Sequence, residues 1–279
     1  MWYNNLQGCY MNEKQFSTPY GVIHYWKNSF DTGKKTLVFL PGLTATHILF
    51  DKQIGFFQDK YNVLIWDAPG HGNSKPFELK FSMEDKARYL HGILETENII
   101  RPILIGQSMG GYVSQMFMEL YPGETRGFIS IDSCSLKRET VTWFDIRILR
   151  HVEPIYRMYK WDKLIKAGSN GCAESEYGRT LMKEMMMTFD KDWYCKVAGH
   201  GFKILADALD SKRRYDIDCP AILLCGTKDK AGSAKRYDKK WAKLTSLPLI
   251  WIEGAGHNSN TDKPEEVNQI IENFVDGLQ

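Results

Sequence analysis

The chain has 279 residues, of which 43% are hydrophobic and 25% are charged, the balance of an ordinary folded protein. Thirty-six Lys and Arg residues against 34 Asp and Glu leave a formal net charge of +2, a field too weak to recruit nucleic acid. No stretch approaches the roughly 20 apolar residues that cross a bilayer. These figures exclude disordered, collagen-like and coiled-coil proteins, and they argue against a nucleic-acid partner and a membrane span.

The first residues, Met1 to Glu13, are polar with scattered aromatic side chains and lack the apolar core of a signal peptide. Six cysteines are widely spaced, with no C-x-x-C pair and no metal-ligand spacing. We therefore expect reduced thiols, no metal site and a cytoplasmic location. The six are Cys9, Cys134, Cys172, Cys195, Cys219 and Cys225.

Short apolar runs alternate with segments of helical periodicity. Lys14–Ser17 and Val22–Trp26, joined at Thr18-Pro19-Tyr20-Gly21, predict an opening β-hairpin. Six further runs are near-continuous in apolar residues, as buried parallel strands are. The sequence thus predicts an α/β fold, with a mostly parallel central sheet and helices on both faces. The six runs are Thr36–Leu40, Asn62–Trp66, Pro102–Gly106, Gly127–Ile131, Ala221–Cys225 and Leu249–Ile252.

Two helical segments are especially regular. Apolar residues from Val113 to Leu120 follow an i, i+3, i+4, i+7 spacing. A second stripe runs from Val267 to Val275, with Pro264 in its first turn. Both spacings predict amphipathic helices that pack on the sheet.

The alternation stops between about Ser133 and Asp218, a span rich in Met and aromatic residues. This composition without a convincing strand predicts a mostly helical insertion over one edge of the sheet. Its apolar side chains could line a substrate pocket or form the insertion's own core, and we favour the core for any single residue.

The strongest motif is Gly106-Gln107-Ser108-Met109-Gly110-Gly111, which follows a predicted strand and opens a predicted helix. A nucleophile elbow needs a serine on such a turn, with small neighbours that leave Oγ exposed at the helix N-terminus. The motif therefore predicts Ser108 as a nucleophile. The alternative is a glycine-rich packing turn in which Ser108 only caps the helix.

A serine hydroxyl needs a base to act as a nucleophile. His257 lies in the loop Gly254-Ala255-Gly256-His257-Asn258-Ser259, after the last predicted strand. There it can swing over the carboxyl edge of the sheet, where Ser108 also lies, so His257 is the predicted base; a solvated loop histidine is the alternative. The other histidines occupy less suitable places, namely His24, His47, His71, His91, His151 and His200.

The base needs a carboxylate that fixes its tautomer and stabilises the imidazolium. Asp229 follows the penultimate predicted strand and is the predicted acid. Asp132 follows the strand Gly127–Ile131 and could reach the same histidine from another loop. It remains the rival candidate.

Charge that develops on the carbonyl oxygen during attack needs two aligned N–H donors. The amide of Met109, directly after the nucleophile, is one candidate. The loop Leu40-Pro41-Gly42-Leu43-Thr44-Ala45-Thr46 follows the third predicted strand and should supply the other. Leu43 N–H is the predicted donor, because Gly42 allows an unusual backbone there.

The segment Asp67-Ala68-Pro69-Gly70-His71-Gly72-Asn73-Ser74 follows the fourth predicted strand. Its composition predicts a tight turn whose side chains satisfy the backbone. A catalytic role for Asp67 or His71 is the minor alternative.

On these residues the chain resembles the α/β-hydrolase superfamily, in the branch with a D-x-x-G-x-G-x-S turn. The resemblance runs from about Gly21 to the C-terminus and is weakest in the insertion. It implies a helical lid at residues 133–218, between strands six and seven, and a core formed by residues 1–132 and 219–279. The site residues that it implies are Ser108, Asp229 and His257 as the triad, with Leu43 in the oxyanion hole.

Two positions depart from the family pattern. Pro41-Gly42 stands where relatives often have His-Gly, which bears on the second oxyanion donor. Gln107 stands where the elbow often has histidine, and we expect no effect on the attack itself.

The sequence therefore predicts a cofactor-free serine hydrolase that cleaves an ester, thioester or lactone of a small, largely apolar acyl group through an acyl-enzyme on Ser108. A carbon–carbon bond hydrolase or an acyltransferase would show the same motif, and Arg147, Arg150 or Arg157 could then anchor a substrate carboxylate. A low-turnover small-molecule receptor on the same fold is the alternative of another class. The sequence does not indicate which oligomeric state the protein adopts.

Overall fold

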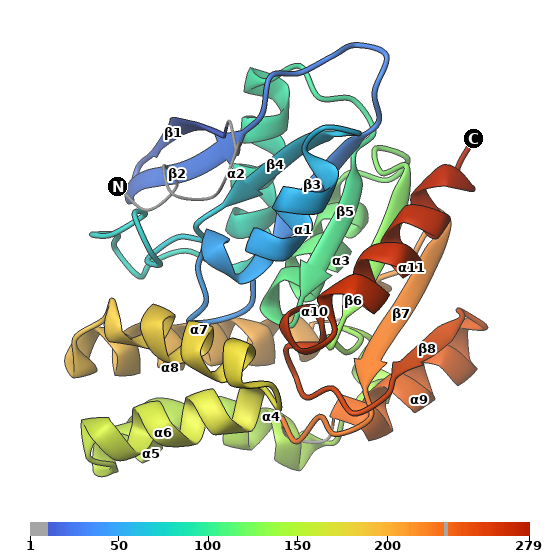
Figure 1. Cartoon of the computed structure of the whole chain (residues 1–279). Coiled ribbons are helices and arrows are strands. Elements are labelled where there is room, and N and C mark those ends of the chain that lie inside the picture. The colour runs from blue at the N-terminus through green and yellow to red at the C-terminus, as the bar shows by residue number, and fades with distance from the viewer. Residues whose placement is uncertain (1–10, 212, 232–233) are drawn as a thin grey trace.

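The computed structural model describes residues 11–211, 213–231 and 234–279, which contain one eight-stranded sheet in the order β1-β2-β4-β3-β5-β6-β7-β8 (Figure 1). β1 and β2 form the predicted hairpin, and β2 also runs antiparallel to β4. All other neighbours are parallel, which confirms the predicted mostly parallel sheet. The strands are β1 Asn12–Thr18, β2 Gly21–Lys27, β3 Thr36–Leu40, β4 Asn62–Trp66, β5 Ile103–Gln107, β6 Gly127–Ile131, β7 Ala221–Gly226 and β8 Leu249–Ile252.

Several helices begin where the sequence supplies a cap. Ser82 and Asp85 form a capping box at the start of α2, and Pro264 opens α11. The helices, with η for a 3₁₀ helix, are η2 His47–Phe50, α1 Asp51–Phe57, α2 Met83–Thr96, α3 Met109–Leu120, η3 Arg138–Thr140, α4 Trp143–Leu149, α5 Val152–Met158, α6 Trp161–Cys172, α7 Glu176–Met187, α8 Lys191–Leu209, α9 Ala234–Thr245, α10 Ser259–Asp262 and α11 Pro264–Asp276.

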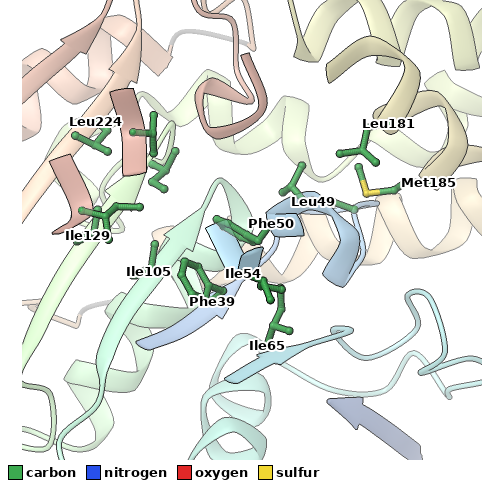
Figure 2. Close-up of a cluster of buried hydrophobic side chains, with 14 of the residues drawn as sticks. Phe39, Leu49, Phe50, Ile54, Ile65, Ile105, Ile129, Leu181, Met185 and Leu224 are labelled. Atoms are coloured by element: carbon green, nitrogen blue, oxygen red, sulfur yellow. The ribbon is translucent and has the colours of Figure 1, made fainter. Parts of the chain in front are cut away.

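The sheet separates two hydrophobic layers because successive strand residues point to opposite faces. Phe39 and Ile105 belong to the cluster that includes side chains of α1 and α11 (Figure 2). Val38 and Leu104 belong to the cluster that includes side chains of α2, α3 and α9. Helices therefore cover both faces, as predicted.

Between β6 and β7 the chain forms η3 and the helices α4 to α8, with no strand in the described part of this span. These helices gather at the edge toward which the parallel strands point (Figure 1). Leu181 and Met185 of α7 pack near Leu49 of η2, in the hydrophobic cluster of the sheet (Figure 2). That this span acts as a lid, and that residues 133–218 form a unit of their own, stay predictions.

The Met and aromatic residues of this span divide between core and surface. Met182, Met185 and Met186 are buried, in agreement with a core role. Trp143 and Phe144 of α4 are 65% and 56% exposed. The core interpretation is therefore wrong for these two aromatic residues.

No helix in the described ranges is both long and apolar enough to cross a membrane. The five described cysteines are all unpaired thiols, and Cys9 lies outside the described residues.

Candidate active site

Ser108 lies on a sharp turn between the last residue of β5 and the first residue of α3. Its φ of 48° and ψ of −115° are strained for a residue with a side chain. The turn is tight enough that a Cβ atom at Gly110 would collide with the carbonyl oxygen of Leu40, and one at Gly106 would collide with the backbone of Gly110 and Gly111. The strand–turn–helix geometry that the motif predicted is therefore present.

Three side chains from separate loops form one hydrogen-bonded chain. His257 Nε2 lies 3.0 Å from Ser108 Oγ, and His257 Nδ1 lies 2.9 Å from Asp229 Oδ2. Because a carboxylate only accepts, Nδ1–H donates to Asp229, which leaves Nε2 as the acceptor for the serine hydroxyl. The second Asp229 oxygen accepts from Ala231 N at 2.7 Å, which fixes the carboxylate.

The electrostatic surroundings of His257 favour its protonated form. Burial alone would lower the pKa of the imidazole, but the charge and hydrogen bond of Asp229 outweigh burial. Asp132 and Asp238 add smaller contributions of the same sign. The pKa of His257 therefore lies above its ordinary value of 6.5.

Asp132, the rival for the acid, has a different set of partners. Its two carboxyl oxygens accept from Gly226 N and Ser259 N, each at 2.8 Å. These bonds connect β6 to the end of β7 and to α10, which begins just after His257. Burial raises the pKa of Asp132 to about 7, and the charge of Asp229 adds to the rise. The geometry pairs His257 with Asp229 and gives Asp132 a bracing position.

Asp132, Cys225 and Asp229 offer ligand atoms within 4.8 Å of one another, a spacing that could hold a metal ion. The donor set does not fit one. Both carboxylates already accept two hydrogen bonds each. Burial also raises the pKa of the Cys225 thiol far above its usual range, which opposes formation of a thiolate ligand.

The two candidate oxyanion donors have open N–H groups. Within the described residues no hydrogen bond engages the amide of Leu43, and no side chain caps the start of α3 at Met109. Gly42 lies directly against the nucleophile, since a Cβ atom there would be 3.1 Å from Ser108 Cβ. The Leu43 side chain packs closely on Gly201 of α8, which holds this loop under the helix.

Gln107 and Asn258 are two site residues whose roles the sequence did not reveal. Gln107 Nε2 donates to His257 O at 2.9 Å and to Asn258 Oδ1 at 3.1 Å. The position of Gln107, next to the nucleophile and in place of the family's histidine, was the available signal.

The turn after β4 is structural, as its composition predicts. Asp67 is fully buried, and its Oδ1 accepts from both His47 N and His47 Nδ1, at 2.7 and 2.8 Å. Its Oδ2 accepts from Asn73 N at 2.7 Å. These three accepted hydrogen bonds tie together the loops beside the site.

The three arginines that could anchor a carboxylate are all exposed. Arg147 lies in α4, Arg150 directly follows α4, and Arg157 lies in α5. Arg150 pairs with Asp207 and Asp210. Arg157 pairs with acidic residues of its own helix and of α8, and Arg147 is exposed. No contact in the described structure places any of the three at the triad.

Comparison with known proteins identifies a family and a fold. A model of the alpha/beta hydrolase family matches residues 37–270. A 2-(acetamidomethylene)succinate hydrolase of Mesorhizobium japonicum is 23% identical over 280 residues, which cover 91% of this chain and 96% of the relative. A 2-hydroxy-6-oxononadienedioate/2-hydroxy-6-oxononatrienedioate hydrolase of Paraburkholderia phymatum is 36% identical over 105 residues, 36% of each chain.

Solved structures share the fold. A thermophilic esterase from Thermogutta terrifontis, solved with malate bound, superposes with a TM-score of 0.75 at 19% identity. The match covers 96% of this chain and 98% of the esterase.

Proposed function

Because the chain belongs to the alpha/beta hydrolase family, we propose that it is a serine hydrolase that cleaves a carboxylic ester, or a related thioester or lactone, through an acyl-enzyme on Ser108. The observation that carries this proposal is the continuous chain from Asp229 through His257 to Ser108 Oγ, with contacts of 2.9 and 3.0 Å. The small, largely apolar acyl group and the cytoplasmic location that the sequence suggests belong to the same proposal.

The geometry supports a two-step reaction. Ser108 Oγ attacks the carbonyl carbon while its proton passes to His257 Nε2, and Asp229 stabilises the resulting imidazolium. The oxyanion receives hydrogen bonds from the Leu43 and Met109 amides. The C–O bond to the leaving group then breaks, and Nε2 returns the proton to the departing alcohol.

The second step regenerates the enzyme. A water molecule gives a proton to His257 Nε2 and attacks the acyl carbon. The bond between the acyl carbon and Ser108 Oγ breaks, and Oγ takes the proton back. The acid product leaves, and no cofactor takes part in either step.

A second candidate reaction keeps the triad and changes the bond that is cleaved. Two relatives are named for hydrolysis of a succinate and of a dioate, substrates that carry free carboxylates. A carbon–carbon bond hydrolase is therefore the leading alternative, ahead of an acyltransferase and of a low-turnover receptor.

The test measures initial hydrolysis of p-nitrophenyl esters from acetyl to dodecanoyl. We expect turnover with a maximum at one chain length, loss of that turnover in Ser108→Ala, and an acyl adduct on Ser108 in the mass spectrum. Ser114→Ala is the matched control, because Ser114 lies in α3, the helix that follows Ser108, and its Oγ donates to Gly110 O. Equal rates for wild type and Ser108→Ala would reject the ester proposal, and cleavage of a vinylogous diketone would then favour the alternative.

A further inference from the structure

Lys86 is a charged residue at a core position of α2. It shares one face of the helix with Met83, Ala87 and Leu90, which are all buried, and it is itself only 1% exposed. Burial lowers the pKa of its amine to about 8, so most of the population still carries the charge at pH 7. Lysine is almost never fully buried unless its charge is paired.

No group in the described part of the chain compensates this charge. The ammonium makes no hydrogen bond or ion pair there, and no carboxylate shifts its pKa. Its aromatic neighbour is Phe81, with the ring centroid 5.6 Å from Nζ. An unpaired buried charge is costly, because it has lost its hydration and gained no partner.

Two histidines lie within the field of Lys86, the buried His71 and the partly buried His200, and both are neutral. Burial lowers the pKa of His71 to about 3 and of His200 to about 4, and the Lys86 charge contributes to both shifts. The charge of Asp67 raises the pKa of His71, and the charge of Asp207 raises the pKa of His200. Neither acid shifts the pKa of the lysine. The cluster of Lys86, His71 and His200 therefore carries one unbalanced positive charge.

The cluster lies at the same edge of the sheet as the nucleophile. Lys86 is in the first turns of α2, and His71 is in the loop that follows the carboxyl end of β4. His200 of α8 is next to Gly201, whose backbone packs against the Leu43 side chain. The oxyanion loop therefore lies against the part of α8 that carries His200.

We propose that Lys86 binds a carboxylate of the substrate, so that the enzyme acts on esters that carry a free acid group. This inference rests on the proposed hydrolase function and names the substrate class for that site. A substrate carboxylate would supply the counter-charge that the protein itself does not provide, and the ammonium would hold it through charge-assisted hydrogen bonds. The apolar stem of Lys86, packed in the core of α2, fixes the place of the charge.

The test compares acidic and neutral esters of equal length. The acidic set is the mono-p-nitrophenyl esters of glutarate, adipate, pimelate and suberate, and the neutral set runs from pentanoate to octanoate. A second pair, 4-acetoxybenzoate and phenyl acetate, moves the carboxylate to the leaving group. We expect wild type to prefer the acid in at least one pair, and Lys86→Met to reduce that preference about 10- to 100-fold, mainly through KM.

Matched variants separate this role from general effects on charge or folding. Lys86→Arg keeps the charge and should retain part of the preference. Lys80→Met removes a lysine whose side chain is 70% exposed and paired with Glu78, and should leave the preference unchanged. An unchanged preference in Lys86→Met would overturn the proposal.

A binding measurement keeps the inference testable if no ester is cleaved. Adipate should raise the thermal unfolding midpoint of Ser108→Ala protein, and the same protein with Lys86→Met should lose that response. Binding without serine-dependent turnover would leave the carboxylate site standing and reject the hydrolase proposal. Serine-dependent turnover in which Lys86→Met changes neither the preference nor the binding of adipate would reject the carboxylate site and leave the hydrolase proposal standing.

Discussion

The side chain of Gln107 holds the backbone of His257. Gln107 Nε2 donates to the His257 carbonyl oxygen at 2.9 Å, and the same nitrogen donates to Asn258 Oδ1 at 3.1 Å. The residue before the nucleophile thus positions the loop of the base. The turn of the nucleophile and the loop of the base are therefore connected twice. Ser108 Oγ contacts His257 Nε2 directly, and the side-chain amide of Gln107 binds the backbone of His257.

We expect Gln107→Leu to lower kcat about tenfold with little change in KM. The substitution keeps the bulk but leaves the His257 carbonyl without its donor, so the imidazole samples unproductive positions. Steady-state kinetics on the best ester of the p-nitrophenyl series would measure the effect. Gln115→Leu is the control, because Gln115 is equally buried and bonds only to backbone of α3 and the loop after β6. If both variants lose only thermal stability, Gln107 is not a positioning residue.

Sequence periodicity sufficed for the sheet, because its central strands are buried on both faces and read as continuous apolar runs. The predicted strand Pro102–Gly106 was wrong by one residue at both ends, because β5 runs from Ile103 to Gln107. The predicted end of β7 at Cys225 was also one residue short, because β7 extends to Gly226. The elbow begins only at Ser108, so Gln107 still belongs to the strand. Local pattern marks the presence of a strand better than its last residue.

Hydrogen bonds between residues far apart in the chain could not be predicted from the sequence. Asp132 and Asp229 both follow strands, and their roles differ because Gly226 N and Ser259 N occupy the oxygens of Asp132. Gln107 and His257 lie 150 positions apart. Lys86 left a local signal, as a charge on the apolar face of a helix, but its lack of a partner could be seen only in the folded structure.

The pH dependence of kcat/KM should report the titration of His257. Only the neutral imidazole accepts the proton of Ser108, so activity should rise with pH through a pKa above 6.5, the direction in which the Asp229 charge moves it. Asp229→Asn should remove that charge and move the acid limb to lower pH, with kcat reduced about 10²- to 10⁴-fold because the imidazole tautomer is no longer fixed. An acid limb that stays in place would assign the titration to another group.

Asp132 should also affect the acid limb, although its own pKa of about 7 leaves it only partly ionised there. Asp132 raises the pKa of His257, so Asp132→Asn should move the limb to lower pH by less than Asp229→Asn does. Its plateau rate should exceed that of Asp229→Asn at least tenfold, because Asp132 contacts backbone amides rather than the imidazole. The exposed Asp59→Asn variant is the control for general charge. A plateau as low as that of Asp229→Asn would make Asp132 the acid of the triad.

Asp238 of α9 makes stability depend on pH. It is 1% exposed and forms no ion pair among the described residues, and burial raises the pKa of its carboxyl to about 8 against the opposing effect of a hydrogen bond with the Cys225 thiol. The folded protein therefore keeps this proton over a range in which the unfolded chain, with an ordinary pKa near 4, has lost it. Its contribution to stability is complete below about pH 4 and is lost as the pH rises to about 8, at up to about 1.4 kcal/mol per pH unit.

Asp238→Asn should remove this dependence, since an amide resembles the protonated carboxyl and does not ionise. We expect the free energy of unfolding in urea to fall between pH 5 and pH 8 by about 1–4 kcal/mol more in wild type than in the variant. The exposed Asp162→Asn variant should follow wild type. Parallel pH profiles for Asp238→Asn and wild type would mean that Asp238 is already ionised at pH 5, and that a counter-charge stabilises it inside the fold.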